Sequence, residues 1–209
     1  RLQTETAAQL LTAGDFLPMA AQLKLTAPID LEVVRLALNG LRESTCDMAA
    51  NLSTESIADF SFRHQLSDLL QSQPTTLRAR LLFEVPEYGV ARHFVAFQDL
   101  TQQLKSLGCR IGIKYFGQDF LESGKLASLG LDYIKVDPGY VRGIGSHSGN
   151  QEFLTGLCTM AHALGMLVIA TGVEQAQDLV LLGQPGFDGF PAPGATRQEQ
   201  PSVTQTLCK

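Results

Sequence analysis

The feature that most constrains the fold is a repeated alternation of short apolar segments with amphipathic helical segments along most of the chain. The short segments are typical of buried strands, and apolar residues at helical spacing follow each of them. The strand candidates are residues 47–52, 80–85, 110–115, 133–136 and 166–171, with a weak sixth near Phe187. The helix candidates are residues 15–23, 31–41, 61–70, 91–107, 122–129, 152–164 and 175–182.

This alternation predicts an α/β protein with a mainly parallel sheet, because a helix between two strands returns the chain to the same end of the sheet. Two architectures fit: a doubly wound open sheet, and an eight-stranded (β/α)8 barrel without its first two strands. The GxGxxG fingerprint of dinucleotide folds is absent, and Gly143-Ile144-Gly145 is better explained as part of a flexible loop. We expect Asp30 to be the N-cap of the second helix, and residues 191–209 to form one helix or a tail.

Composition excludes several classes of protein. The 209 residues are 44% hydrophobic and 18% charged, which fits one globular domain over residues 1–209 and excludes extensive disorder. The apolar runs are far shorter than the roughly 20 residues that cross a bilayer. Sixteen basic against 21 acidic residues give a net charge of −5, which disfavours a nucleic acid polymer as partner.

The cysteines indicate a reducing compartment, because they are widely spaced and form no CxxC pair. We expect buried free thiols at Cys46, Cys109, Cys158 and Cys208. The sequence begins at Arg1 without a methionine, so it is expected to be part of a longer chain. The expected location is therefore the cytoplasm, either alone or as the cytoplasmic domain of an inner-membrane protein.

Polar residues stand at the carboxyl ends of five consecutive strand candidates, where (β/α)8 barrels hold their chemistry. They are Asn51; Glu84 and Glu87; Lys114 and Tyr115; Lys135 and Asp137; and Thr171 and Glu174. One polar residue at a strand end is usually only hydrated, but five such ends favour a shared site. Carboxylate and amide oxygens suit Mg²⁺, Mn²⁺ or Ca²⁺, and a lysine suits a phosphate oxygen. An ion pair with Asp137 is the alternative for Lys135.

Several segments, in order along the chain, resemble motifs of the EAL-domain family. The strand-end segments are Ala49-Ala50-Asn51-Leu52-Ser53, Phe83-Glu84-Val85-Pro86-Glu87, Tyr133-Ile134-Lys135-Val136-Asp137 and Ala170-Thr171-Gly172-Val173-Glu174. Gly14-Asp15-Phe16-Leu17-Pro18 resembles the family's early helix entry, and Met160-Ala161-His162-Ala163-Leu164-Gly165 its penultimate helix. Arg1 resembles the arginine that follows the name-giving triplet, so two strands are expected upstream of this chain.

The resemblance implies a modified (β/α)8 barrel, without its first two strands here, that binds or hydrolyses cyclic di-GMP. Active members use a two-metal phosphodiesterase site. Carried over, the metal-side ligands are Asn51, Glu84 and Asp137, whereas Lys135 contacts the phosphate or the attacking water. The resemblance also implies that Arg1 contacts a phosphate.

In the same family pattern, Glu87 and Glu174 brace the loop after the fifth barrel strand.

The chain departs from the family pattern at positions that serve catalysis. Lys114 and Tyr115 stand where the family has paired aspartates before Phe-Gly. Thr171 stands where the family has the glutamate that acts as general base. An ammonium about 4 Å from a divalent ion is repelled by roughly 8 kcal/mol at an effective dielectric near 20, so metal binding beside Lys114 is disfavoured. Thr171 cannot take a proton from water near neutral pH. We therefore expect no catalytic residue, no bound metal and no cofactor.

The expected function is a catalytically inactive cyclic di-GMP receptor, similar to the LapD type of inner-membrane receptor, that signals through changed domain contacts. The ligand-binding candidates are Arg1, Asn51, Glu84, Lys114, Tyr115, Lys135, Asp137 and Glu174. Expected partners are cyclic di-GMP, a second copy in a homodimer and a flanking GGDEF-type domain.

Two alternatives stay open. One is an interaction module that binds no nucleotide, because Pro191-Ala192 replaces a glutamine-glycine pair of the family and could close the pocket. The other is an active phosphodiesterase, which would need Mg²⁺ or Mn²⁺.

Overall fold

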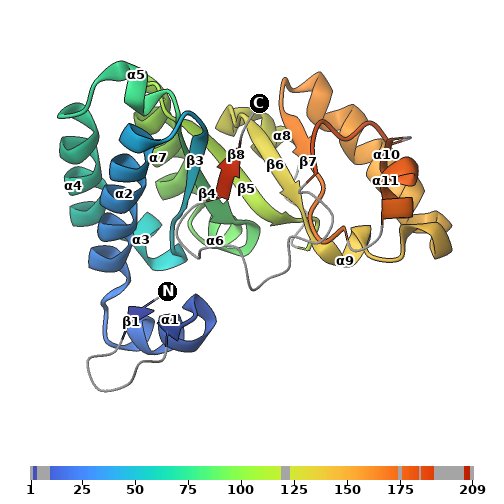
Figure 1. Ribbon diagram of the computed structural model, residues 1–209. Coiled ribbons are helices and arrows are strands. Elements are labelled where there is room, and N and C mark those ends of the chain that lie inside the picture. Colours follow the sequence, from blue (N-terminus) through green and yellow to red (C-terminus); the bar gives the residue numbers. More distant parts are fainter. Residues whose placement is uncertain are drawn as a thin grey trace.

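A six-stranded sheet forms the centre of the molecule in a computed structural model (Figure 1). The structure describes residues 2–3, 10–118, 123–173, 176–183, 185–190 and 205–207. Five parallel strands follow one another in chain order: β3 (Asp47–Asn51), β4 (Leu81–Pro86), β5 (Arg110–Phe116), β6 (Tyr133–Val136) and β7 (Leu167–Ile169). The sixth strand, β8 (Gln205–Leu207), pairs antiparallel with β3.

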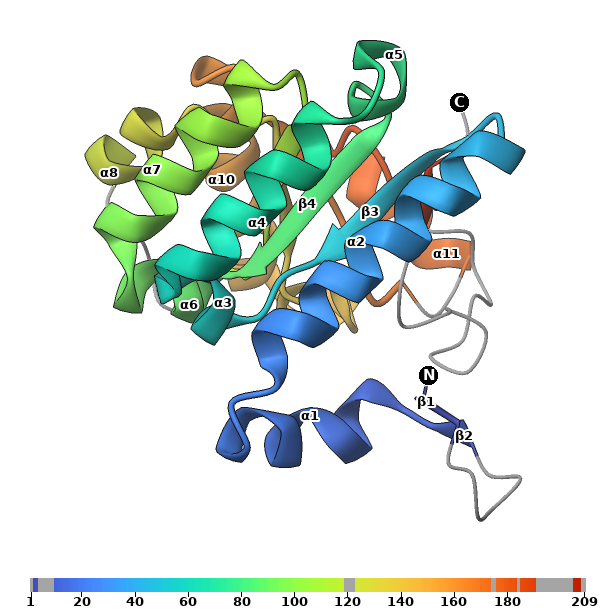
Figure 2. The ribbon, with the colours of Figure 1, turned by 90° about the vertical axis from the view of Figure 1, so that its left-hand side faces the viewer.

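Two short strands and a helix lie apart from this sheet. β1 (Leu2–Gln3) and β2 (Leu10–Leu11) form an antiparallel pair, and α1 (Ala13–Gln22) follows them. Both views place this N-terminal part away from the helices that cover the sheet (Figures 1 and 2). The other helices are α2 (Thr26–Glu43), α3 (Thr54–Ala58), α4 (Phe60–Gln71), α5 (Thr75–Arg78), α6 (Glu87–Arg92), α7 (Phe94–Ser106), α8 (Ser123–Leu129), α9 (Pro138–Val141), the 3₁₀ turn η1 (Ile144–Ser146), α10 (Ser148–Ala163) and α11 (Ala176–Gly183).

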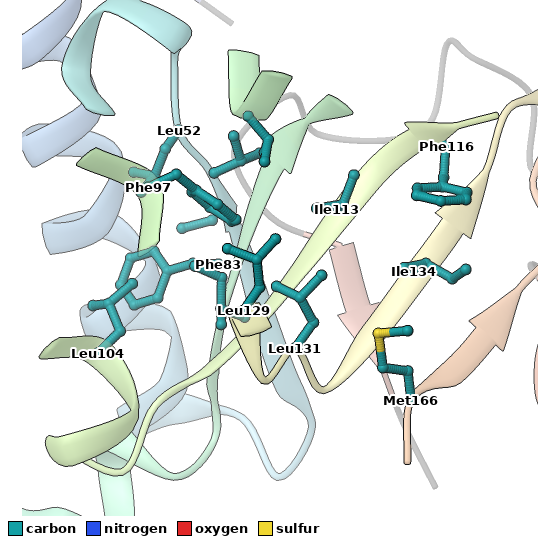
Figure 3. Close-up of a cluster of buried hydrophobic side chains, with 14 of the residues drawn as sticks. Leu52, Phe83, Phe97, Leu104, Ile113, Phe116, Leu129, Leu131, Ile134 and Met166 are labelled. Atoms are coloured by element: carbon teal, nitrogen blue, oxygen red, sulfur yellow. The ribbon is translucent and has the colours of Figure 1, made fainter. Parts of the chain in front are cut away.

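The main core lies between one face of the sheet and the helices. Alternate strand residues point to opposite faces, so Phe83 and Ile134 join the large helix-side cluster, whereas their neighbours Leu82 and Tyr133 lie in a much smaller cluster. Figure 3 labels ten side chains of the large cluster: Leu52, Phe83, Phe97, Leu104, Ile113, Phe116, Leu129, Leu131, Ile134 and Met166. The opposite face carries few apolar residues, which leaves room there for polar side chains.

The predicted α/β fold with a parallel sheet is confirmed. Because the helices share one core on one face and the strand order follows the chain, the doubly wound alternative is wrong. Among the described residues the sheet order runs from β7 to β8 without closing into a barrel. The weak strand predicted near Phe187 is reduced to a single parallel bridge between Ile169 and Gly189.

The prediction for Asp30 is wrong. α2 begins at Thr26 instead, because Pro28 in the first helical turn removes only an N–H that has no partner within the helix. Asp30 therefore lies inside the helix and is buried. The helix predicted over residues 91–107 is also divided at His93 into α6 and α7.

The polar C-terminal stretch contains a strand, which the prediction of one helix or a tail missed. Residues 205–207 pair with the exposed edge of β3, and this edge cannot be located from the sequence alone. Cys109 and Cys158 are buried and free as predicted, but Cys46 is disulfide-bonded, so the free thiol predicted there is wrong. Cys208 lies outside the described residues.

No helix in the described ranges combines the length and the apolar character that a membrane span requires.

Candidate functional site

Four of the predicted site residues lie on the face of the sheet opposite the helices, at the carboxyl ends of adjacent strands. Asn51 pairs in register with Glu84, and Pro86 pairs with Lys114. Asn51, Glu84 and Lys114 are each one position away from an apolar residue that faces the helices. The alternation of strand side chains therefore directs all three to the opposite face. Lys135 on β6 follows the same rule, because Ile134 and Val136 belong to the helix-side core.

β5 has an irregularity beside Lys114. The register between β5 and β6 shifts between Ile113 and Phe116, and Tyr115 has a positive φ of 58°. Such a bulge re-aims the side chains beside it. The Lys114 ammonium Nζ donates a hydrogen bond to Oδ1 of Asn51 at 2.6 Å and lies 5.3 Å from the centre of the Tyr115 ring.

The second lysine forms a buried ion pair. Nζ of Lys135 lies 2.5 Å from Oε1 of Glu84, and the two side chains are only 4% and 2% exposed. The hydroxyl of Tyr133 donates to the same Oε1 at 3.1 Å. This geometry favours the ion-pair explanation for Lys135, but with Glu84 as the partner in place of Asp137.

The two lysines and the neighbouring carboxylates form one electrostatic group. Burial lowers the pKa of the Lys114 ammonium, and the negative charge of Glu84 opposes this shift. The positive charge of Lys135 lowers the pKa of Lys114 further, and Asp30 raises it. The group thus contains two negative side chains, Asp30 on α2 and Glu84 on β4, and two positive ones, Lys114 on β5 and Lys135 on β6.

Asp137 and Glu87 hold the loop that follows β5. Asp137 accepts hydrogen bonds from the Gly139 backbone N–H at its Oδ1 and from Nε2 of Gln118 at its Oδ2, each at 2.7 Å. Oε2 of Glu87 accepts from the backbone N–H groups of Gly117 and Gln118, both at 2.9 Å. These contacts connect β4, β5 and β6 through the loop.

Three further residues near the site, Thr171, Phe116 and Tyr115, differ in how accessible they are to a ligand. The Oγ1 hydroxyl of Thr171 donates to the Val136 carbonyl at 2.5 Å, so it is held by the backbone. Phe116 packs in the helix-side core, whereas Tyr115 is 45% exposed and has ring surface accessible at the site. Of these two aromatic residues, Tyr115 is the one whose ring a ligand can reach.

Asp30 is a site residue that the sequence reasoning missed. Its carboxylate is buried and accepts from the Ser53 backbone N–H at 2.6 Å and from the Ser53 hydroxyl at 3.1 Å. The signal was present in the sequence, because Asp30 is four residues before Val34 and eleven before Leu41 on the apolar stripe of α2. A carboxylate on such a stripe needs a partner in the core.

The residues of this site do not fit a pair of metal ions. No group of three or more His, Cys, Asp or Glu residues suited to a metal ion occurs among the described residues. Lys114 donates to the oxygen of Asn51 that a metal would need, and Lys135 neutralises Glu84. Two-metal phosphoryl chemistry requires several oxygen ligands around ions about 4 Å apart.

Three predicted features lie outside the described residues: Arg1, Glu174 and the Pro191-Ala192 pair.

Comparisons with known proteins agree with this fold. The model of the EAL domain family matches residues 1–190. Cyclic di-GMP phosphodiesterase PdeF of Escherichia coli is 30% identical over 174 residues, which are 81% of this chain and 23% of PdeF. The chain thus spans less than a quarter of that relative's length.

Two solved structures are similar to the described fold. The FimX EAL domain from Pseudomonas aeruginosa bound to c-di-GMP has a TM-score of 0.81 and 28% identity, over 90% of this chain and 76% of that chain. A Vibrio cholerae LapD structure comprising S helix, GGDEF and EAL parts, bound to c-di-GMP, has a TM-score of 0.82 and 24% identity, over 89% of this chain and 46% of that chain.

Proposed function

This chain belongs to the EAL domain family, and we propose on that basis that it is a catalytically inactive domain that binds cyclic di-GMP without a metal ion. One observation carries the proposal: the Lys114 ammonium lies 2.6 Å from Oδ1 of Asn51, where a phosphodiesterase needs a metal ion. A fixed ammonium can attract a phosphate oxygen, but it cannot activate water as a metal ion does.

The remaining contacts support binding more than cleavage. Glu84 is occupied by Lys135 and Tyr133, and Asp137 by Gln118 and Gly139. Thr171 has no carboxylate to accept a proton from water. The similarity to the FimX domain bound to c-di-GMP, at 28% identity, supports the same nucleotide as the ligand.

In this proposal the two phosphates of cyclic di-GMP lie near Lys114 and Lys135, and Tyr115 stacks on one guanine. Stacking of a base on an aromatic ring contributes about 1–3 kcal/mol. Arg1 and Glu174 remain proposed ligand contacts on the strength of their sequence motifs. Glu87 shapes the loop beside the ligand through its hydrogen bonds to Gly117 and Gln118.

Calorimetric titration with cyclic di-GMP in the presence of EDTA tests the proposal. We expect 1:1 binding by the unaltered chain and at least about tenfold weaker binding by Lys114→Ala, since a charged hydrogen bond to phosphate is lost. The matched control is Lys105→Ala, whose ammonium pairs with Asp132 at 3.0 Å and lies at the other end of the sheet. A well-folded chain that takes up no dinucleotide would contradict the proposal.

An active phosphodiesterase is the competing function, and the 30% identity to PdeF favours it. Incubation with cyclic di-GMP and either Mg²⁺ or Mn²⁺ separates the two functions. We expect no linear dinucleotide product with either ion, and its appearance at a rate above that of Glu84→Gln would establish the enzyme.

The output of the domain is also a proposal. We propose that the nucleotide changes contacts with a flanking GGDEF-type domain of a longer cytoplasmic or inner-membrane protein, and that the chain forms a homodimer. The match to only 23% of the length of PdeF supports the presence of further domains in such proteins. Co-purification with a GGDEF-type domain that depends on cyclic di-GMP would support this output.

A further inference from the structure

A buried acidic residue on α2 is linked to the candidate site in two ways. The first link is structural: Asp30, 3% exposed, accepts hydrogen bonds from both the backbone N–H and the hydroxyl of Ser53. Ser53 is the N-cap of α3 and follows Asn51 by two residues. Asp30 therefore holds the chain segment that leaves β3 just after the Asn51 side chain.

The second link is electrostatic. The positive charge of Lys114 on β5 acts on the Asp30 carboxyl, and the Asp30 charge acts on the Lys114 ammonium. Among the described residues, Lys114 is the charged group that lowers the pKa of Asp30. Glu84 on β4 raises the pKa of Lys114, and Lys135 on β6 lowers it. Burial nevertheless dominates and raises the pKa of Asp30 to about 6.

An apolar side chain would satisfy packing at this position, because Leu31, Val34 and Leu38 of the same helix face the core. A buried carboxylate is costly unless its environment compensates for the lost hydration. The hydrogen bonds to Ser53, the side chain of Ser56 on α3 and the charge of Lys114 contribute to this compensation.

We propose that Asp30 is a positioning residue of the site whose charge opposes an anionic ligand beside Lys114, so that binding of cyclic di-GMP takes up a proton at Asp30. The inference rests on the proposed function, because it requires a dianionic nucleotide in the site. A phosphate near Lys114 brings negative charge toward Asp30, and like charges increase the affinity of a carboxylate for its proton. A protonated Asp30 still accepts from the Ser53 N–H and donates its O–H to the Ser53 hydroxyl, so the segment after β3 keeps its position.

Calorimetry near pH 6 in two buffers of different ionisation enthalpy measures the proton uptake. We expect the unaltered chain to take up roughly a third to a half of a proton per cyclic di-GMP, since Asp30 is only partly protonated there before binding. Asp30→Asn resembles the protonated carboxyl in shape and charge, so its uptake should fall close to zero. Asp132→Asn is the control, because Asp132 also accepts a backbone N–H and pairs with a lysine, but at the amino end of β6.

The affinity profile provides a second readout. Between about pH 7.5 and 5.5 the unaltered chain should bind about three- to fivefold more tightly at the lower pH, as expected for one neutralised charge near the ligand. Asp30→Asn should show the tighter binding at both pH values, whereas Asp30→Ala, which cannot hold Ser53, should bind more weakly than either. A purely structural role of Asp30 would give the unaltered chain and Asp30→Asn the same change in affinity between the two pH values.

Carbon NMR of the Asp30 carboxyl in the unaltered chain covers the case in which a variant does not fold. Saturation with cyclic di-GMP should move the carboxyl titration to higher pH. Binding without this movement, or equal proton uptake by the unaltered chain and Asp30→Asn, overturns the inference and leaves the proposed function intact. If the unaltered chain gives no binding heat at either pH, the proposed function fails with it.

Discussion

Lys114 and Asp30 are the two residues whose environments most affect the chemistry of this site. The Lys114 ammonium donates a short hydrogen bond to Oδ1 of Asn51. Asp30 is an acid within a helix stripe of Leu and Val, and it is held by Ser53.

The Asp30 carboxyl predicts a pH dependence of stability. Burial raises its pKa from 3.8 to about 6 in the folded chain. Between these two pH values the folded state therefore holds a proton that the unfolded state has lost. Protonation stabilises the fold below about pH 4, and this contribution is lost as the pH rises through about 6. A shift of about two pKa units corresponds to roughly 3 kcal/mol.

Chemical denaturation of the unaltered chain and of Asp30→Asn at several pH values measures this contribution. We expect the free energy of unfolding of the unaltered chain, relative to that of the variant, to fall by about 2–3 kcal/mol between pH 4 and pH 7. A constant difference over this range would mean that Asp30 titrates in the folded chain as it does in the unfolded chain.

At the scale of elements, β5 lets its neighbours β4 and β6 interact across it. Gly112 pairs with Glu84 on one side and with Tyr133 on the other. A Cβ at position 112 would lie 2.5 Å from Cε2 of the Tyr133 ring, so only glycine lets this ring pass over β5. The Tyr133 hydroxyl thereby reaches Glu84.

Gly112→Ala should therefore disrupt the site from a position that carries no charge. We expect a loss of about 1–3 kcal/mol in the free energy of unfolding, because a methyl group is forced into a packed region. Weaker binding of cyclic di-GMP should accompany this loss as Glu84 loses its tyrosine partner. Gly124→Ala on α8 is the control, since a Cβ there meets no atom within 4 Å; an equal loss in both variants would contradict the argument.

The loop after β5 is held at its start by Glu87. Glu87→Ala removes the acceptor for the N–H groups of Gly117 and Gln118, which are both 2.9 Å from its Oε2. Hydrogen exchange of these two amides should accelerate by at least about tenfold, which corresponds to about 1.4 kcal/mol for one lost hydrogen bond to a charged group. The amide of Ile111, which donates to Asp132, should keep its rate and serves as the internal reference.

At the scale of the whole molecule, the C-terminal strand protects one edge of the sheet. β8 pairs antiparallel with β3, from Asp47 opposite Leu207 to Ala49 opposite Gln205. An uncovered strand edge offers free backbone groups to another chain. β8 therefore occupies an edge through which a second copy could otherwise pair.

Deletion of residues 201–209 should increase self-association of the chain. We expect sedimentation velocity to detect dimers or larger species at concentrations at which the full chain sediments as a smaller species. Asp47→Pro within the truncated chain should reduce this association, because proline removes a backbone donor at the edge. A truncated chain that sediments like the full chain would show that β8 does not control assembly.

Local sequence patterns determined much of this fold. The period-two alternation of Phe83, Glu84 and Val85 predicts both a strand and the face on which Glu84 lies, because a strand side chain has only two directions available. The same local rule places Lys135. These properties depend on residues close together in the chain.

Only the tertiary structure decided the partners of these side chains. Lys135 pairs with Glu84 in place of Asp137, Tyr133 reaches Glu84 across Gly112, and Asp30 holds Ser53 from another element. Each contact joins residues more than twenty positions apart, and their distance depends on strand order and on the bulge in β5. Local patterns carry no information on such distances, because they result from the packing of the whole sheet against its helices.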